Sequence, residues 1–347
     1  MSEGTNQPLP VKNRFQGTVI LLTTAITLYF VAAVTGLWTS GFLDSVTSGT
    51  LTQLEAQTKQ LGFDLNNSIV DRSEILSGGP PKDGIPSLTN PRFSKATDVR
   101  YLKPDDRVIG VAIGQDARAY PLAILNYHEI ANDKIGETAF AVTYCPLCDS
   151  AAVFDRRTSL GVREFGVSGL LHNSNLLMYD RRGKPESLWS QIRAQGISGP
   201  AASEKLKLIP FELTTWKQWS TWYPKTLVLS EQTGHKRDYQ KHPYVEYFKQ
   251  ERLMFPVKPM DYSRPAKSLV LGVWHGKKSR GYPLSEFSRD RTRIEDEIDG
   301  KKLVIEYAPD EKSLRVAEAE DGIQWIYSFW FAWYSAHPDT TVYQHKK

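Results

Sequence analysis

Two segments of this chain resemble two later segments, and such an internal repeat limits the possible folds more than any other feature. RVIGVAIGQDARAYPLAIL begins at Arg107, and the similar LVLGVWHGKKSRGYPLSEF begins at Leu269. Further along, WKQWSTWYPKTLVL from Trp216 is matched by WFAWYSAHPDTTVY from Trp330. Because the two matches occur in the same order, we expect an internal duplication that produces two related β lobes.

The strand-like segments of the chain are short and follow one another closely. VIGVAI and AFAVTY are rich in β-branched and aromatic residues, and AAVFDRR, VREFGVSG and NLLMYDRR continue the pattern after charged or glycine-rich turns. The 20 prolines and 24 glycines favour turns over long helices. Tryptophans at three-residue spacing, from Trp216 to Trp222, indicate a short helix that ends at Pro224. The sequence therefore predicts a mainly β fold with short helices, a β-rich α+β protein.

Changes in composition divide the chain into segments. Polar residues followed by LSGGPPKDGIPSL indicate a stalk or extended lead-in over residues 44–88. A first β lobe with both cysteines is expected over 89–232, a connector over 233–267 and a second, degenerate β lobe over 268–347. The second copy has KKLVIEYAPDEKSLRV where the first has its cysteine motif. Features common to both copies, such as R-x-Y-P-L, are therefore interpreted as scaffold.

The N-terminal region is apolar enough to cross a membrane. Residues 15–43 carry no charge, and about 20 apolar helical residues span the hydrocarbon core of a bilayer. Lys12 and Arg14 precede this segment. The positive-inside rule then predicts a cytoplasmic tail over 1–14, a transmembrane anchor over 15–43 and a periplasmic or otherwise extracytoplasmic body on a single-pass protein of the cytoplasmic membrane. A cleaved signal sequence is the alternative, and it exports the same body.

The charge of the chain bears on its partners. A net charge of +4 over 347 residues is too small to indicate nucleic-acid binding. The membrane, through the N-terminal segment, is the partner that the sequence predicts. A protein partner or a substrate stays unidentified.

Both cysteines of the chain, Cys145 and Cys148, lie in VTYCPLCDS. A disulfide at this spacing closes a very short loop and adds little stability, so a catalytic or metal-binding pair is favoured. A redox pair of this kind is usually activated by a helix that follows the first cysteine, but here the next residues have the pattern of a turn and a strand. A turn between two strands can instead direct both sulfurs at one metal ion. A strained disulfide or two reduced structural thiols form the third possibility.

A metal centre needs ligands beyond the two thiolates. His128 in LNYHEI, His172 in LLHNSN and Met178 in LLMYD lie in the part of the first copy that the second copy lacks. Thiolate, imidazole and thioether are soft ligands, which favour copper and then zinc. With Cys145 and Cys148 as ligands, we expect His128 as the third and His172 or Met178 as the fourth.

Polar residues also surround the cysteine motif. Side chains of this kind usually satisfy backbone groups in turns, but they form a pocket if the strands of the motif pair as neighbours. Asp149 and Asp155 flank the cysteines and are candidates for a base or for an acceptor that orients a ligand. The other pocket candidates are Ser168, Asn173, Asn175, Asp180 and Trp189.

Several long motifs together resemble one protein family. RAYPLAILNYHEIAND, TYCPLCDSAAVFDRR, FGVSGLLHNSNLLMYDRR and ESLWSQ are similar to those of a widespread bacterial and archaeal family of exported or membrane-anchored proteins, known as a domain of unknown function. The resemblance is dense over residues 80–230 and weaker in the second copy, and it implies no established activity. Members usually have glycine directly after the second cysteine. This chain has Asp149 there, which tightens the sterics of the turn.

The sequence thus predicts a membrane-anchored extracytoplasmic protein with a copper or zinc site at Cys145 and Cys148, used for metal handling or electron transfer. One alternative is a thiol–disulfide oxidoreductase that uses the same two cysteines. The other is a non-catalytic module that binds a protein partner or a glycan through its Asn, Ser and Trp residues. Whether the protein is an enzyme stays open at this point.

Overall fold

The protein is built mainly of β-strands with a few short helices, over residues 62–181 and 185–345 that the computed structural model describes. The fold class predicted from the sequence is confirmed at this level. The predicted tail and membrane-spanning segment, residues 1–43, lie outside the described residues, as does the first part of the predicted stalk. No described helix combines the length and the apolar character that crossing a bilayer requires.

The first half of the described chain contains most of the strands. Its helices are α4 (Leu122–His128) and α5 (Trp216–Trp222), with 3-10 turns η1 (Arg72–Glu74) and η2 (Ala96–Asp98). Its strands are β1 (Ile75–Ser77), β2 (Leu88–Thr89), β3 (Phe93–Lys95), β4 (Arg107–Ile113), β5 (Asp116–Pro121), β6 (Ile130–Ile135), β7 (Thr138–Cys145), β8 (Ser150–Asp155), β9 (Arg157–Thr158), β10 (Gly161–Val162), β11 (Glu164–His172), β12 (Asn175–Arg181), β13 (Leu188–Ser190), β14 (Gln195–Ser198), β15 (Glu212–Thr215) and β16 (Leu227–Leu229).

The second half is shorter. After helix α6 (Val245–Lys249) it contains α7 (Trp330–Ala336) and the 3-10 turn η3 (Leu284–Glu286). Its strands are β17 (Leu269–His275), β18 (Lys278–Pro283), β19 (Arg293–Ile298), β20 (Lys301–Ala308), β21 (Ser313–Ala319), β22 (Gln324–Phe329) and β23 (Thr341–Val342).

The same strand arrangement occurs in both halves. In the first, the β4–β5 hairpin is flanked by β15, antiparallel to β4, and by β16, parallel to β5. In the second, the β17–β18 hairpin is flanked by β22, antiparallel to β17, and by β23, parallel to β18. The registers also agree, because Gly110 faces Glu212 in one half and Gly272 faces Ile326 at the matching position of the other.

A tryptophan packs against a glycine in each half. A Cβ atom added to Gly110 would lie 2.2 Å from the Trp219 ring, and one added to Gly272 would lie 2.2 Å from the Trp333 ring. Trp219 Nε1 donates to Thr226 Oγ1 at 3.0 Å, and Trp333 Nε1 donates to Thr340 Oγ1 at the same distance. The spacing of the tryptophans thus places one ring of each short helix over a strand position that only glycine fits.

The R-x-Y-P motif has the same role in both halves. Arg118 and the Tyr120 hydroxyl both bond Asp133, on β6. Arg280 and Tyr282 bond Asp296, on β19, in the same way. The motif thus links β5 to β6 in the first half and β18 to β19 in the second. This shared role agrees with the interpretation of R-x-Y-P as scaffold.

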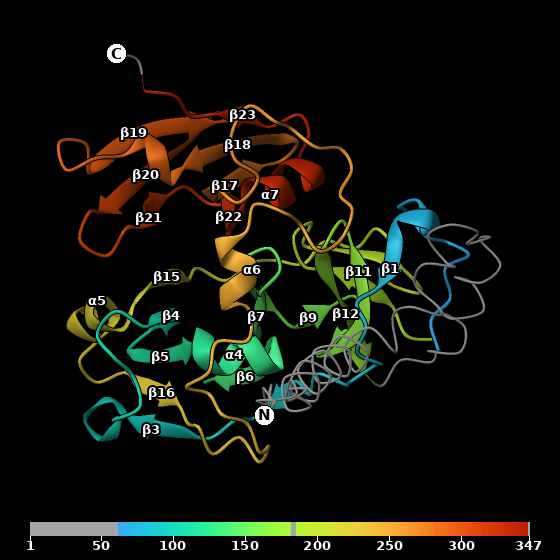
Figure 1. Ribbon diagram of the computed structural model, residues 1–347, viewed down its shortest axis with the longest axis horizontal. Coiled ribbons are helices and arrows are strands. Elements are labelled where there is room, and N and C mark those ends of the chain that lie inside the picture. Colours follow the sequence, from blue (N-terminus) through green and yellow to red (C-terminus); the bar gives the residue numbers. More distant parts are fainter. Residues whose placement is uncertain (1–61, 182–184, 346–347) are drawn as a thin grey trace, which may run out of the picture. The chain divides into compact units, whose positions relative to one another are not determined.

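One sheet of eight strands runs through both halves, in the order β2-β6-β7-β8-β22-β17-β18-β23 (Figure 1). The contact between the halves is a short antiparallel pairing of β8 with β22, at Ala151 and Tyr327. The backbone N–H of Phe329 also donates to the carbonyl of Cys148 at 2.7 Å. The second half therefore contacts the cysteine turn directly.

Part of the predicted stalk belongs to the sheets, which corrects the boundary at residue 88. β1 pairs with β11, with Ile75 opposite His172. β2 pairs with β6, with Leu88 opposite Ala131. The glycine- and proline-rich run between β1 and β2 breaks regular structure only locally, so the short apolar segments on either side still add to sheet edges.

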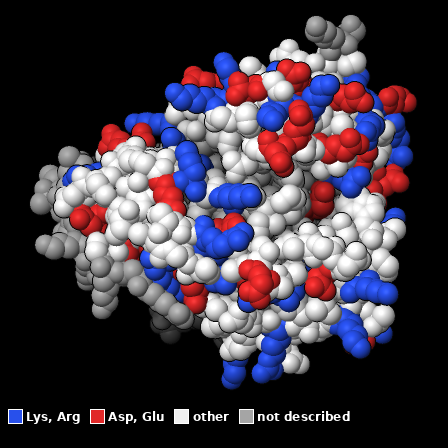
Figure 2. Space-filling view, turned by 180° about the vertical axis from the view of Figure 1, so that it is seen from behind, with Lys and Arg blue, Asp and Glu red and all other residues white. Residues whose placement is uncertain are grey.

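Charged side chains of both signs are interspersed on the face shown in Figure 2, as the small net charge predicts. Several form pairs along β19 to β21, where Arg293 and Arg315 both bond Glu306. Fields of mixed sign cancel beyond short distances.

Candidate functional site

The two cysteines lie in the tight turn that joins β7 to β8. Cys145 is the last residue of β7 and pairs with Ser150, the first residue of β8. The backbone N–H of Cys148 donates to the Cys145 carbonyl at 3.2 Å. Asp149 has φ of 44°, in the left-handed region that favours glycine. The turn thus brings Cys148 back beside Cys145, as the predicted turn between two strands requires.

The corresponding turn of the second half has the same geometry without cysteines. Ala308 pairs with Ser313 as Cys145 pairs with Ser150. Lys312, directly before Ser313, has φ of 48°, close to the value at Asp149. The backbone therefore does not need cysteine to form this turn, and the two sulfurs are additions to a common framework.

Both cysteines are free thiols within the protein interior. Cys145 is 1% exposed and Cys148 is fully buried. Their sulfurs approach the same acceptor, the carbonyl oxygen of Ser174, at 3.9 Å and 3.2 Å, and the two thiols are hydrogen-bonded to each other. The predicted convergence of the two sulfurs is therefore observed, in a buried position.

Hydrogen bonds make the two thiols unequal. Burial alone opposes ionisation of Cys145, but the Cys148 thiol and the backbone N–H groups of Leu176, Cys148 and Leu147 all donate to its sulfur, and together they lower its pKa. Burial raises the pKa of Cys148 well above its ordinary value, and the neighbouring Cys145 raises it further. The pair therefore favours one thiolate, at Cys145, and one thiol, at Cys148. Sequence reasoning expected a helix to activate the thiol, whereas turn amides do so here.

A buried polar network supports the turn from β12. Asn175 donates to Ser150 Oγ at 3.0 Å and to Gln191 Oε1 at 2.9 Å, and it also bonds the Cys148 sulfur. Gln191 Nε2 donates to Thr143 Oγ1 at 3.1 Å. Because every group in this network is held by another, the side chains around the sulfurs have little freedom. Asn175 was a predicted pocket residue, and the structure places it beside the cysteines.

The connector between the two halves covers the turn. Tyr247, on α6, donates from its hydroxyl to the Leu147 carbonyl at 2.9 Å, and Figure 1 shows α6 near the end of β7. Asn173 exchanges two bonds with the backbone of Lys258, at 2.8 Å and 2.9 Å. Lys267 holds the end of α6 by donating to the Gln250 carbonyl at 2.6 Å. A reagent reaches the sulfurs only when this cover moves.

Glu129 is a functional candidate that sequence reasoning missed. It is buried directly after α4 with φ of 56°, a strained value for a non-glycine residue. Burial raises its pKa well above the ordinary value, and the charge of Cys145 raises it further. The Glu129 carboxyl group therefore favours its neutral form and lies within electrostatic reach of Cys145. The only sequence signal was its position next to His128 in LNYHEI.

His128, the predicted third metal ligand, is engaged elsewhere. Its Nδ1 lies 2.7 Å from the Pro86 carbonyl, to which it donates, and its Nε2 lies 2.7 Å from the Tyr239 hydroxyl, from which it accepts. Burial lowers its pKa to about 4. Both ring nitrogens thus have partners that are not metal ions, and the imidazole is neutral at physiological pH.

The other predicted ligands also have separate environments. His172 Nε2 lies 3.2 Å from Glu74 Oε2, and burial lowers the pKa of this imidazole. Met178 is buried on β12 opposite Trp189. Among residues 62–181 and 185–345, no group of three or more His, Cys, Asp or Glu side chains is arranged to hold a metal ion. The predicted metal centre therefore receives no third ligand of these types from the described part of the chain.

Most of the remaining pocket candidates hold the scaffold together. Asp149 accepts two bonds of 2.9 Å from Arg107 and one of 2.7 Å from Tyr144. Asp155 pairs with Arg157. The other three bond or pack within one sheet: Ser168 with the Leu177 carbonyl, Asp180 with the Ser187 N–H, and Trp189 edge-on against Phe165, two strands away.

A small polar cavity adjoins the charged side of the turn. Its volume is about 260 Å³, and its lining includes Arg107, Tyr144, His242 and Asn126. The side-chain oxygen of Asn126 is buried there without a hydrogen-bond partner. Arg107 and Tyr144 connect the lining of this cavity to the cysteine turn through their bonds to Asp149. The cavity is therefore a place where a polar group of a substrate can lie close to the turn.

Comparison with known proteins locates the site within a family domain. A family model described as "Protein of unknown function (DUF3179)" matches residues 82–340. No curated protein and no solved structure matches the chain. The matched range contains both cysteines, Glu129 and α6, so the whole candidate site lies inside the domain.

Proposed function

As the chain belongs to a family described as a protein of unknown function, we propose from its own residues that Cys145 and Cys148 form a redox-active dithiol that exchanges with substrate disulfides. The observation that supports this most is that one turn brings both sulfurs to the same carbonyl, that of Ser174, at 3.9 Å and 3.2 Å, while hydrogen bonding lowers the pKa of Cys145. A thiolate is the attacking species in disulfide exchange. A second thiol in contact with it is what resolves the mixed disulfide.

The exchange proceeds in two balanced steps. The Cys145 thiolate attacks a substrate disulfide, the substrate S–S bond breaks, and the first departing sulfur takes the proton of Glu129. Cys148 then gives its proton to the Glu129 carboxylate and attacks the Cys145 sulfur. The mixed disulfide breaks, and the second departing sulfur takes a proton from water. Two electrons pass from the protein to the substrate, and a partner dithiol restores the reduced pair by the reverse sequence.

Glu129 fits the role of proton carrier in this sequence. A general acid or base works best when its pKa lies near the working pH. Burial and the Cys145 charge both move the pKa of Glu129 upward from the acidic range of free carboxyl groups. This shift favours the protonated form of Glu129 when the thiolate attacks, as the proposed first step requires, and the carboxylate left behind is the acceptor for the Cys148 proton in the next step.

Metal handling is supported less well than exchange. The sulfurs converge, but both nitrogens of His128 are engaged with Pro86 and Tyr239, and His172 is paired with Glu74. A copper or zinc ion bound by two thiolates would need ligands from outside the described residues. Metal binding is accordingly treated as one outcome of the test below.

Two broader proposals accompany the redox function. The first is that the two halves derive from a duplication, since their strand registers and turn geometries agree. In this proposal the second half lost its cysteines, and Ala308 now stands at the position of Cys145. The apolar segment 15–43 anchors the domain to the outer face of the cytoplasmic membrane. An oxidising compartment suits a dithiol whose work is disulfide exchange.

Mass spectrometry of the full-length chain tests the redox proposal. Reduced protein is incubated in glutathione buffers of increasing oxidised fraction. We expect a loss of two hydrogen atoms per chain as the internal disulfide forms. Cys148→Ser should accumulate a mixed disulfide at Cys145, because the resolving thiol is missing. Cys145→Ser should react much more slowly, because burial keeps Cys148 protonated.

Control measurements separate the redox role from the alternatives. The double variant Cys145→Ala, Cys148→Ala should fold, as shown by circular dichroism, and should not exchange. Elemental analysis of the purified wild type should show no stoichiometric copper or zinc. Stoichiometric metal that is lost in Cys145→Ala would overturn the redox proposal in favour of a metal centre. Unchanged mass at every buffer composition would also overturn it.

A further inference from the structure

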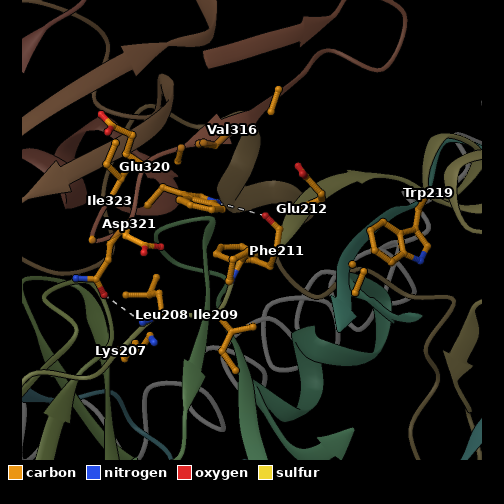
Figure 3. Close-up of a pocket in the computed structure, with 18 of the residues that line it drawn as sticks. Lys207, Leu208, Ile209, Phe211, Glu212, Trp219, Val316, Glu320, Asp321 and Ile323 are labelled. Atoms are coloured by element: carbon orange, nitrogen blue, oxygen red, sulfur yellow. Dashed lines mark hydrogen bonds between the residues drawn. The ribbon is translucent and has the colours of Figure 1, made fainter. Parts of the chain in front are cut away.

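Two cavities in the described part of the chain differ in how their polar groups are bonded. The larger, of about 460 Å³, lies between β15 and β21 and is shown in Figure 3. In its wall, Trp325 Nε1 donates to the Phe211 carbonyl at 3.3 Å, and the Leu208 N–H donates to Gln324 Oε1 at 3.1 Å. Among the described residues, no buried side-chain nitrogen or oxygen that lines this cavity lacks a partner. No buried group there requires a ligand.

The smaller cavity, beside the cysteine turn, contains an unpaired polar group. Asn126 lies on α4 and is 4% exposed, and its side-chain oxygen has no hydrogen-bond partner among the described residues. It lines the cavity of about 260 Å³ together with Arg107 and His242. A buried oxygen without a partner destabilises the fold. A ligand that donates a hydrogen bond to Asn126 would remove this cost.

Neither helix formation nor packing accounts for Asn126. Asparagine is a weaker helix former than alanine, and here it lies inside the helix Leu122–His128 rather than at its cap. The one other polar residue on the buried face of α4 is His128, and both of its ring nitrogens are bonded within the protein. A polar side chain that lowers stability and has an unpaired oxygen is typical of a functional site.

Two other side chains of this cavity offer hydrogen-bond donors. Both bonds from Arg107 to Asp149 come from Nη1, so within the described chain its Nε and Nη2 N–H groups are left for other acceptors. His242 accepts the Tyr244 N–H at its Nδ1, at 3.2 Å, and partial burial lowers the pKa of its ring. The neutral ring therefore carries its proton on Nε2. The cavity thus combines an unpaired acceptor with several donors.

The charges of the lining balance one another. Arg107 is already paired with Asp149. The remaining charged side chains of the lining are two basic and two acidic ones, Lys103, Lys241, Asp105 and Asp106. No excess charge selects an ion. A neutral ligand with one N–H donor and one carbonyl acceptor matches these walls, and a backbone peptide group carries this pair.

We propose that this cavity binds a peptide group of the substrate, with its N–H donating to Asn126 and its carbonyl accepting from Arg107 or His242. The proposal rests on the proposed disulfide exchange and identifies the substrate as a polypeptide disulfide. The position suits this role, because the bond from Arg107 to Asp149 joins the lining to the cysteine turn. The volume of about 260 Å³ is below the range of about 300–1,000 Å³ for drug-sized ligands and suits a short piece of extended chain.

Ligand-observed NMR on the full-length Cys145→Ala, Cys148→Ala variant tests binding apart from redox chemistry. The probes are N-acetylglycine methyl ester and O-acetylglycolic acid methyl ester, which differ only in that an ester oxygen replaces the amide N–H. We expect the amide to bind about tenfold more tightly, the effect of one hydrogen bond to a buried acceptor. Equal affinities of the two probes, or no binding of either, would overturn the proposal.

A matched pair of variants locates the effect. Asn126→Ala, in the same cysteine-free background, should bind both probes equally weakly. It should unfold at no lower urea concentration than its parent, because the asparagine oxygen has no partner to lose. Asn66→Ala makes the same change at an exposed position outside the lining, and it should keep the preference for the amide. A preference that survives in Asn126→Ala, or disappears in both variants, would contradict the assignment.

Exchange rates in the chain with both cysteines connect the cavity with the dithiol. The disulfide of N-acetylcysteine methyl ester carries amide groups of the peptide type, and bis(2-hydroxyethyl) disulfide carries none. Asn126→Ala should slow exchange with the first about tenfold and leave exchange with the second unchanged. Equal slowing of both would overturn the role of the cavity in substrate binding. If neither disulfide reacts with the wild type while the amide probe still binds, the redox function is overturned and peptide binding alone is supported.

Discussion

Asp149 shows how one residue can occupy a position that suits glycine. Its φ of 44° is matched by 48° at Lys312 in the second turn, so this strained backbone is a feature of both turns. At Asp149, bonds from Arg107 and Tyr144 hold the carboxylate and offset the cost of the conformation. These bonds therefore stabilise a non-glycine residue in a backbone conformation that favours glycine.

Glu129 gives a prediction about stability. Its pKa is raised in the folded state by burial. An unfolded glutamate ionises above about pH 4.3, so raising the pH above that value favours the unfolded chain until the folded pKa is passed. The free energy of unfolding of the wild type should therefore fall, relative to Glu129→Gln, by up to about 1.4 kcal/mol per pH unit in that window.

Urea denaturation of both proteins at several pH values measures this difference. Groups other than Glu129 titrate in both proteins, so they cancel when the two curves are subtracted. Parallel curves across the neutral range would show that Glu129 has an ordinary pKa in the folded protein. The proton-carrier role proposed for it would then have no basis.

Residue roles were predictable only where they depend on local sequence. The spacing of Cys145 and Cys148 was sufficient to predict that their sulfurs converge. His128 was assigned to a metal because its real partners, Pro86 and Tyr239, lie 42 and 111 residues away along the chain. Glu129 was missed because its burial and its left-handed backbone arise from tertiary packing.

The short tryptophan helices and the strands beneath them give a prediction at the scale of elements. Gly110→Ala would place a methyl group 2.2 Å from the Trp219 ring. The ring is fully buried and cannot move aside without disturbing its bond to Thr226. We expect a loss of about 3 kcal/mol in the free energy of unfolding, at the upper end of the usual cost of overpacking, measured by urea denaturation.

A double-mutant cycle tests the cause of that loss. Trp219→Leu removes the ring atoms that the added methyl group would meet. Gly110→Ala should then cost at least about 1 kcal/mol less in the Trp219→Leu background than in the wild type. Additive costs would mean that Gly110 is required for another reason, such as the backbone itself. Gly272→Ala with Trp333→Leu should repeat the result in the second half.

Elements with a strong local pattern were the ones that the sequence predicted well. The β4–β5 and β17–β18 hairpins, the β20–β21 hairpin and the α5 helix all follow from alternation, turns or tryptophan spacing. Helix α4 did not, because it begins with a continuous apolar run, LAIL, and lacks the regular three-residue spacing that the tryptophans give to α5, a helix of the same length. β1 and β2 were expected in a stalk because the residues between them are typical of loops.

At the scale of the whole molecule, the second half supports the site in the first. The N–H of Phe329 donates to the Cys148 carbonyl at 2.7 Å. Phe329 has φ of −69°, which proline adopts without strain. Phe329→Pro should therefore remove this bond without straining φ, and it sets the proline Cδ against the Cys148 carbonyl, beyond the loss of the ring. Phe329→Ala is the matched control, since it removes the ring and keeps the N–H.

We expect Phe329→Pro to be less stable than Phe329→Ala by about 1–3 kcal/mol, the cost of a buried carbonyl without a partner. Urea denaturation gives the free energies, and the rate of thiol alkylation should increase in the same order. Equal stability of the two variants would show that the second half does not support the cysteine turn through this bond.

The joining of the halves was beyond prediction from the sequence. The repeat indicated two related lobes, but the sheet that connects them depends on one short pairing, between Ala151 and Tyr327. Nothing in the local pattern of β8 or β22 distinguishes an edge strand from one that pairs with a distant partner. The cavity between β15 and β21 is likewise a consequence of how the halves meet.

The central claim is that the buried turn stabilises a thiolate at Cys145, and a pH titration of thiolate ultraviolet absorbance tests it most directly. We predict that one of the two thiols of the reduced full-length protein ionises below the ordinary cysteine value of about 8.5, because donors to the Cys145 sulfur lower its pKa. This transition should disappear in Cys145→Ala, and in Cys148→Ala it should remain but move to higher pH, because one donor to the Cys145 sulfur is lost. If both thiols ionise at or above about 8.5, or if the early transition belongs to Cys148, the claim is contradicted.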